Sequence, residues 1–82
     1  MYYIYLAKCR DGTYYCGYTA NLENRIETHN KGMGAKYTKK RRPITLVYSE
    51  QFETRSLAMK RELEIKKMGH MQKIILARGW QK

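Results

Sequence analysis

The sequence predicts an α+β fold in which one small sheet and a few helices enclose a small core. Two runs of aromatic and β-branched residues flank an Asp-Gly pair near the N-terminus, the strongest short-range signal for a β-hairpin. A third alternating run adds a strand, and apolar residues at helical spacing occur before and after it. A chain of 82 residues buries only about 60 to 65% of its unfolded surface, so residues 1–82 are expected to form one domain.

The loop of the hairpin decides which side chains share a face, because side chains alternate along a strand. A two-residue turn at Asp11-Gly12 would place Tyr15 on the face opposite Tyr5. A three-residue loop that begins at Arg10 and leaves the glycine left-handed would place both tyrosines on one face. We favour the longer loop, because it gives an apolar face of Ile4, Leu6, Tyr14, Cys16 and Tyr18, and a second face of Tyr3, Tyr5, Ala7, Thr13, Tyr15 and Gly17.

A helix is predicted over Leu22–Asn30, directly after the hairpin. Asn21 is a good N-cap, and Gly32 follows the end of the helix as a C′ glycine. Arg25 and His29 are four residues apart in this helix, so they project from the same side.

The segment from residue 31 to residue 43 is strongly basic, with six Lys or Arg, no acid and one tyrosine. The whole chain carries 17 Lys and Arg against 7 Asp and Glu, a formal charge of +10, which favours a polyanionic partner. A short helical turn is expected at residues 35–38. The side chains expected to hold a nucleic-acid backbone are Lys36, Lys39, Lys40, Arg41 and Arg42.

The third strand and two further helices complete the prediction. Pro43 favours an extended exit from the basic segment, and the strand that follows presents Ile44, Leu46 and Tyr48 on one face. Thr54 caps the next helix, Gly69 ends it, and its apolar stripe comprises Leu57, Ala58, Ile65 and Met68. A final helix over about residues 71–78 is expected to turn Ile74 and Ile75 inward.

Glu62 lies on the shoulder of that stripe, roughly 40° from Ala58 at 100° per residue. Carboxylates are normally avoided there, so a bound cation would explain its position. A pair with Lys66, four residues on, is the more common explanation for such a residue.

Together, these polar residues suggest phosphodiester hydrolysis, although each alone has a structural explanation. A phenol or imidazole, such as Tyr5, Tyr15 or His29, can take a proton. The guanidinium of Arg25 can grip a phosphate, and the carboxylate of Glu62 can hold a divalent metal. No Ser-His-acid arrangement, CxxC metal motif or glycine-rich phosphate loop offers a competing chemistry.

The chain resembles the GIY-YIG nuclease superfamily, and most closely its small one-domain bacterial members, many of them without an assigned role. The family's Gly-Ile-Tyr corresponds to Tyr3-Ile4-Tyr5, and its Tyr-Ile-Gly to Tyr15-Cys16-Gly17. Its first-helix signature resembles Asn21-Leu22-x-x-Arg25-x-x-x-His29-Asn30, and its metal-binding segment resembles Glu62-x-x-Ile65-Lys66. Tyr18 stands where several active members carry a lysine.

The resemblance implies a three-stranded antiparallel sheet flanked by helices and a single-metal cut of DNA, in repair or recombination. It implies that Glu62 binds Mg²⁺ or Mn²⁺ and that Arg25 stabilises the phosphoryl charge. It implies that Tyr5 or Tyr15 acts as the base or orients the attacking water, with His29 assisting. A nucleic-acid-binding module or scaffold with little catalysis is the alternative.

The remaining expectations concern partners and compartment. Family nucleases usually carry a second domain that selects the target, so a protein partner or the structure of the nucleic acid is expected to do so here. No run of 18 apolar residues occurs, and the chain starts on a strand, so neither a membrane span nor a signal peptide is expected. A cytoplasmic protein with Cys9 and Cys16 as reduced thiols on opposite faces of the hairpin is therefore predicted.

Overall fold

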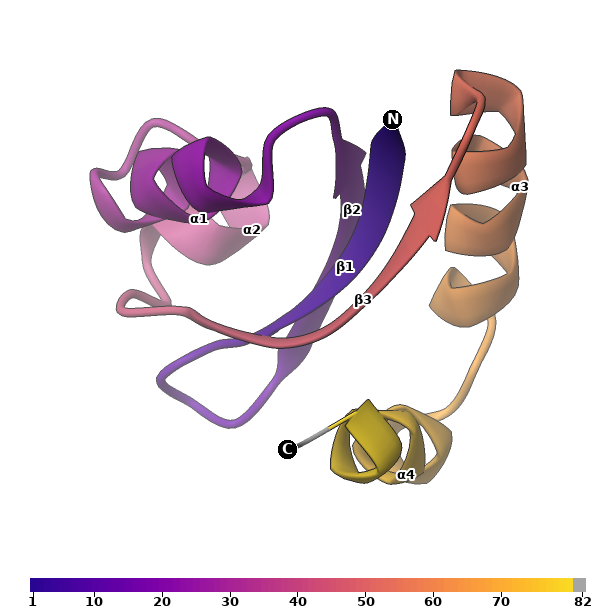
Figure 1. Ribbon diagram of the computed structural model, residues 1–82. Coiled ribbons are helices and arrows are strands. Elements are labelled where there is room, and N and C mark those ends of the chain that lie inside the picture. Colours follow the sequence, from indigo (N-terminus) through magenta and orange to yellow (C-terminus); the bar gives the residue numbers. More distant parts are fainter. Residues whose placement is uncertain (81–82) are drawn as a thin grey trace.

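Three antiparallel strands form one sheet in the order β2-β1-β3, with helices on both faces (Figure 1). The computed structural model describes residues 1–80. Helices α1 and α2 cover one face of the sheet, and α3 and α4 cover the other. The predicted α+β fold and its order of elements are confirmed, with β1 at Tyr2–Lys8, β2 at Tyr14–Thr19, α1 at Leu22–Asn30, α2 at Lys36–Lys39, β3 at Thr45–Phe52, α3 at Arg55–Lys66 and α4 at His70–Trp80.

The hairpin between β1 and β2 has the three-residue loop. The backbone N–H of Cys9 donates to the carbonyl of Thr13 at 2.8 Å, and that of Gly12 donates to the carbonyl of Cys9 at 3.0 Å. Gly12 has a φ of 86°, a left-handed conformation that favours glycine. Tyr5 consequently pairs with Gly17. The two-residue alternative is wrong, and the predicted division of the hairpin into two faces is confirmed.

Strand β1 is buried on both faces, so two apolar clusters lie on either side of the sheet. The cluster facing α3 comprises Ile4, Leu6, Cys16, Ala58 and Ile65. The cluster on the α1 face comprises Tyr5, Ala7, Cys9 and Ile44. The two cysteines are free and lie in different clusters. A central strand covered on both faces explains why β1 is nearly continuous in apolar residues.

The prediction that Ile44, Leu46 and Tyr48 share one face of the third strand is wrong. In the pairing of β1 with β3, Leu6 lies opposite Tyr48, but Ala7 lies opposite Leu46. Val47 is thus an extra residue, a β-bulge, and a bulge reverses the alternation of side chains beyond it. As a result Leu46 packs on the Tyr5 face while Tyr48 packs on the opposite face. The alternating pattern alone gave no sign of this irregularity.

Two predictions for the last helices are also wrong. Leu57 was expected in the apolar stripe of α3 but is 49% exposed, and Ile75 was expected inward in α4 but is 64% exposed. Elsewhere in α4, Ile74 is half-buried, Leu76 packs against the cluster that faces α3, and Ala77 is buried. α3 contacts the sheet along a narrow seam in which Ala58 and Ile65 are buried, so the whole predicted stripe is not needed for packing. Within residues 1–80, no helix is long and apolar enough to cross a membrane.

Candidate active site and nucleic-acid interface

Four of the five predicted catalytic side chains meet on the α1 face of the sheet. Tyr5 comes from β1, Tyr15 from β2, and Arg25 and His29 from α1. The Tyr5 hydroxyl lies 2.8 Å from His29 Nε2 and accepts a hydrogen bond from Arg25 Nε at 3.3 Å. The Tyr15 ring packs 5.2 Å from the His29 ring and 6.3 Å from the Tyr5 ring, measured between centroids. We name these four residues the tyrosine cluster.

Thr38, a residue that the sequence did not single out, fixes which ring nitrogen of His29 carries the proton. The buried Thr38 hydroxyl donates to the carbonyl of Ala35 at 3.0 Å. Its oxygen therefore accepts from His29 Nδ1–H, 2.7 Å away. A neutral imidazole with its proton on Nδ1 has a lone pair on Nε2, so the hydrogen-bond network has Tyr5 donating to His29. A single hydroxyl within a basic run gave no signal of this role.

Burial sets the protonation of the cluster at neutral pH. Burial raises the pKa of Tyr5 to about 12, an effect that the hydrogen bond from Arg25 only partly offsets. Burial, reinforced by the positive charge of Arg25, lowers the pKa of His29 to about 4. Because the pKa of the phenol stands far above that of the imidazole, the proton stays on Tyr5. The resting site thus holds a neutral phenol and a neutral imidazole.

Two glycines make room for the cluster. A Cβ at Gly17 would lie 2.7 Å from the Tyr5 hydroxyl oxygen, closer than real Cβ contacts allow. A Cβ at Gly34 would overlap the ring of His29. Gly17 belongs to the motif that the sequence already singled out. Gly34 was not predicted, because a glycine in a basic loop carries no pattern of its own.

A second layer of side chains supports Tyr15 from the α2 side. The Tyr37 ring stacks on the Tyr15 ring at 6.1 Å with an angle of 27° between their planes. The guanidinium carbon of Arg41 lies 4.0 Å from the centre of the Tyr37 ring, on its face. Arg41 Nε also donates to Asp11 Oδ2 at 3.0 Å. The hairpin loop, α2 and Tyr15 are thus joined in one continuous stack.

Glu62 lies on the opposite side of the sheet from the tyrosine cluster. It belongs to α3, and its backbone carbonyl accepts from the Cys16 thiol at 3.9 Å. Cys16 directly follows Tyr15 in the edge strand β2. Within residues 1–80, no hydrogen bond or ion pair joins Glu62 to the other four predicted residues. Hydrogen bonds and ring contacts thus join four of the five predicted catalytic residues, and Glu62 is not among them.

The surroundings of Glu62 limit how it could hold a metal. Its side chain is 14% exposed, and its cation partner is Lys66, with 3.6 Å between Nζ and Oε2. In the described part of the chain, no three His, Cys, Asp or Glu side chains gather as a metal site. A lone carboxylate still suits Mg²⁺, which commonly keeps several waters and binds through one or two carboxylates plus substrate phosphates. Glu62 therefore fits a metal shared with the substrate rather than a metal enclosed by protein.

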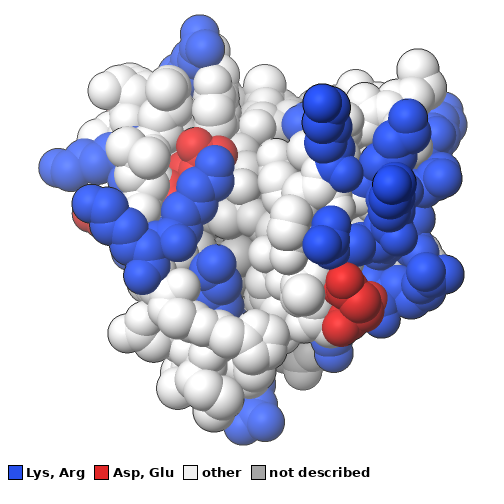
Figure 2. All heavy atoms as spheres, turned by 180° about the vertical axis from the view of Figure 1, so that it is seen from behind, with Lys and Arg blue, Asp and Glu red and all other residues white. Residues whose placement is uncertain are grey.

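Positive charge flanks the face on which β2 lies. Figure 2 views the molecule from behind Figure 1, and it shows Lys and Arg in two groups on either side of an uncoloured strip. Of the five predicted phosphate-binding residues, two also have structural roles. Arg41 contacts Asp11 and the carbonyl of Tyr37, and Arg42 donates to two backbone carbonyls. The exposed lysines of the set are Lys36, Lys39 and Lys40.

Comparison with known proteins identifies the family of this chain. A family model described as the GIY-YIG catalytic domain matches residues 1–73. The chain belongs to the GIY-YIG family. Its relatives include a UPF0213 protein of Staphylococcus haemolyticus, 56% identical over 73 residues that make up 89% of each chain. A UPF0213 protein of Staphylococcus aureus is 51% identical over 75 residues, 92% of each chain.

Two solution NMR structures resemble this GIY-YIG domain. The UPF0213 protein from Bacillus halodurans is 39% identical, with a TM-score of 0.59 that covers 95% of this chain and 84% of that chain. A protein from E. faecalis is 49% identical, with a TM-score of 0.60 that covers 88% of this chain and 77% of that chain. Membership of the GIY-YIG family makes this a nuclease domain, whose substrate is nucleic acid.

Proposed function

We propose that this GIY-YIG protein is an endonuclease that hydrolyses phosphodiester bonds in DNA with the help of Mg²⁺ or Mn²⁺. The observation that carries the proposal is the hydrogen-bonded chain from the half-buried Arg25 through the buried Tyr5 and His29 to Thr38, with the half-buried Tyr15 beside it. Fixed donors of this kind stabilise charge that develops on a phosphoryl group without a cost of reorganisation.

The two tyrosines take different roles in this proposal. Tyr5 is 0% exposed, and its hydroxyl already donates to His29 and accepts from Arg25. It is therefore a positioning residue that holds the guanidinium in place. Tyr15 is half-buried and lies against the same histidine, so it is the phenol that reaches the attacking water. Arg25 binds the phosphate, because its hydrogen bond to Tyr5 uses Nε and leaves the Nη groups for an anion.

Glu62 would hold the divalent ion from the other side of β2. When bound, such an ion neutralises charge on the phosphoryl oxygens. The role of Glu62 in this chain is to present an oxygen ligand at a position with little exposure to water. Lys66 forms an ion pair with that carboxylate. This ion pair would have to break for Glu62 to bind a metal.

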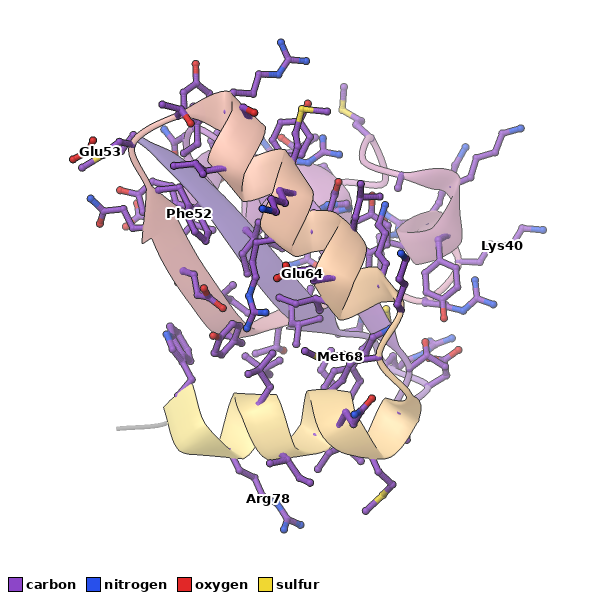
Figure 3. The ribbon with its side chains drawn as sticks, turned by 90° about the vertical axis from the view of Figure 1, so that its right-hand side faces the viewer. Lys40, Phe52, Glu53, Glu64, Met68 and Arg78 are labelled. Atoms are coloured by element: carbon purple, nitrogen blue, oxygen red, sulfur yellow. The ribbon has the colours of Figure 1, made fainter. Side chains whose placement is uncertain are left out.

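Cleavage of supercoiled plasmid, single-stranded and branched DNA in Mg²⁺ or Mn²⁺ tests the proposal. The decisive comparison is Glu62→Gln against Glu64→Gln. Glu64 lies on the same helix (Figure 3), where it is 52% exposed and pairs with Arg61. We expect Glu62→Gln to abolish cleavage and Glu64→Gln to leave it intact. Wild-type protein that cuts no substrate with either metal, or a Glu62→Gln protein that cuts like the wild type, would refute the proposal.

A nucleic-acid-binding module with little catalysis is the second candidate, and the environment of Tyr18 favours it. Several active family members resemble this chain but carry a lysine at this position. Here the Tyr18 hydroxyl accepts two hydrogen bonds from Arg55, at 3.1 and 3.2 Å. The position is thus tied to a structural partner. Binding of DNA without cleavage in any metal would select this candidate.

A further inference from the structure

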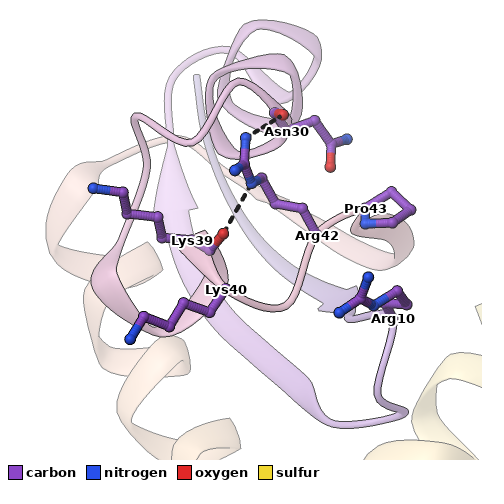
Figure 4. Close-up of a pocket in the computed structure, with 6 residues that line it drawn as sticks. All are labelled: Arg10, Asn30, Lys39, Lys40, Arg42 and Pro43. Carbon is purple, nitrogen blue, oxygen red and sulfur yellow. Dashed lines mark hydrogen bonds between the residues drawn. The ribbon is translucent and has the colours of Figure 1, made fainter.

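A strongly basic pocket lies where the hairpin loop, the end of α1 and the segment after α2 meet. Its volume is about 660 Å³, and Figure 4 shows the residues that line it: Arg10, Asn30, Lys39, Lys40, Arg42 and Pro43. Four of these six carry a positive charge and none carries a negative charge. The residues of α2 that contact the tyrosine cluster are Tyr37 and Thr38. The pocket is therefore separate from the proposed cutting site.

Arg42 is held in the pocket without an acidic partner. Its Nε donates to the carbonyl of Lys39 at 2.8 Å, and its Nη1 donates to the carbonyl of Asn30 at 3.3 Å. Gly32, with a φ of 81°, leaves the room for this guanidinium. Two other arginines of the described chain do pair with acids, Arg41 with Asp11 and Arg61 with Glu50 and Glu64. Among residues 1–80, no acid therefore neutralises the charge of Arg42, and its two hydrogen bonds fix its orientation, which lowers the entropy cost of binding an anion.

The walls of the pocket are tied to one another by hydrogen bonds to backbone groups. The Asn30 side chain donates to the carbonyl of Ile44 at 3.1 Å and accepts from its N–H at 2.7 Å, so the end of α1 is fixed to the start of β3. The backbone N–H of Arg10 donates to the carbonyl of Arg41 at 2.9 Å, which fixes the hairpin loop to the same segment. Hydrogen bonds therefore join three segments that are far apart in the chain into one basic pocket.

We propose that this pocket binds a phosphate group of the nucleic acid beside the point of cleavage, and so anchors the flanking strand. The inference rests on the proposed function in taking nucleic acid as the ligand. Arginine and lysine side chains are the usual phosphate contacts in such complexes. The volume lies within the range of about 300–1,000 Å³ typical of ligand pockets, which suits a sugar-phosphate unit. The phosphate belongs either to an internal phosphodiester or to the end of a strand.

The test measures binding of a fluorescent DNA duplex in EDTA, where no metal-dependent cleavage occurs, at several salt concentrations. The pocket variant combines Arg10→Gln with Lys40→Gln. Neither side chain makes a hydrogen bond or ion pair within residues 1–80, so the fold should be retained. The matched control combines Lys60→Gln on α3 with Arg78→Gln on α4. Arg78 points away from the body of the molecule (Figure 3).

Each phosphate contact contributes about −0.9 to the slope of log K against log salt concentration. The pocket variant should therefore lose about one unit of slope, and the control variant should keep the slope of the wild type. An unchanged slope in the pocket variant, or an equal decrease in the control, would overturn the inference. NMR titration with inorganic phosphate should shift the amide signals of Arg10 and Arg42 before that of Tyr15, and the opposite order would also count against it.

Two further arms separate the source of the phosphate and the dependence on the proposed function. A preference for a 5′-phosphorylated over a 5′-hydroxyl duplex that is lost in the pocket variant identifies a terminal phosphate. Equal binding of the two duplexes, together with the decrease in slope, identifies an internal phosphodiester. A protein that never cleaves but shows the decrease in slope keeps the pocket and loses the nuclease proposal. A protein that cleaves with an unchanged slope does the reverse.

Discussion

Replacing Thr38 by Val would test the hydrogen-bond chain that holds the tyrosine cluster. Valine has nearly the shape of threonine, so the change removes the hydroxyl without opening a cavity. Thr38 is 0% exposed, and its hydroxyl makes two hydrogen bonds, to the carbonyl of Ala35 and from His29 Nδ1. Removing both bonds and leaving one buried N–H without a partner together cost about 2–4 kcal/mol of the free energy of unfolding. For a domain of this size, that lowers the melting temperature by roughly 10 °C or more.

Thr38→Ser is the matched control, because it keeps the hydroxyl and loses only a methyl group, worth about 1 kcal/mol. Urea unfolding of both variants gives the difference that belongs to the hydroxyl. NMR of the His29 ring nitrogens gives a second readout. In the wild type, Nδ1 should carry the proton and Nε2 should be unprotonated, and Thr38→Val should weaken this preference. A Thr38→Val protein as stable as the serine variant, with unchanged ring signals, would refute the assigned direction of the chain.

Three other predictions follow from the same contacts. Tyr5→Phe should cost about 1–3 kcal/mol in urea unfolding, because it leaves the buried His29 Nε2 without its donor; Tyr15→Phe should hardly change stability but should abolish cleavage, and equal effects on both properties would contradict the roles proposed above. The pKa of His29 is lowered on folding from 6.5 to about 4, so its contribution to stability is complete above pH 6.5. As the pH falls towards 4, the unfolded chain takes up the proton first, and about 3 kcal/mol of the free energy of unfolding should be lost. A His29→Gln protein that loses as much free energy over the same pH range would show that other groups are responsible. The last prediction concerns three exposed lysines of the basic segment, Lys36, Lys39 and Lys40. Changing them to Ser should reduce the slope of log K against log salt concentration by about 0.9 for each phosphate that is no longer bound. An unchanged slope would show that these lysines do not touch phosphate.

The features that the sequence could predict are those that depend on local chemistry. The Asp-Gly pair locates the hairpin, the alternation of apolar residues favours the loop that puts Tyr5 and Tyr15 on one face, and the Asn21 cap determines the start of α1. Helical spacing then places Arg25 and His29 together. All these signals lie within a few residues of the structure that they specify.

The features that were missed depend on how distant segments pack. The bulge at Val47 is visible only in the pairing of β3 with β1. Thr38 becomes important only because α2 packs against α1 and brings its hydroxyl to His29. Glu62 was correctly placed at the edge of a buried stripe, but spacing within one helix does not say which face of the sheet that helix covers. Tertiary packing decides each of these cases.

The order of the strands explains how groups on both faces could act on one phosphate. β2 is an edge strand, and its successive residues Tyr15 and Cys16 point to opposite faces of the sheet. Tyr15 faces the tyrosine cluster, while the Cys16 thiol contacts the backbone of Glu62. A substrate lying on either face of the sheet would reach only one of these sets, because the sheet separates them. A nucleic-acid strand that crosses the free edge of β2 could meet both, and it would lie between the two groups of positive charge seen in Figure 2.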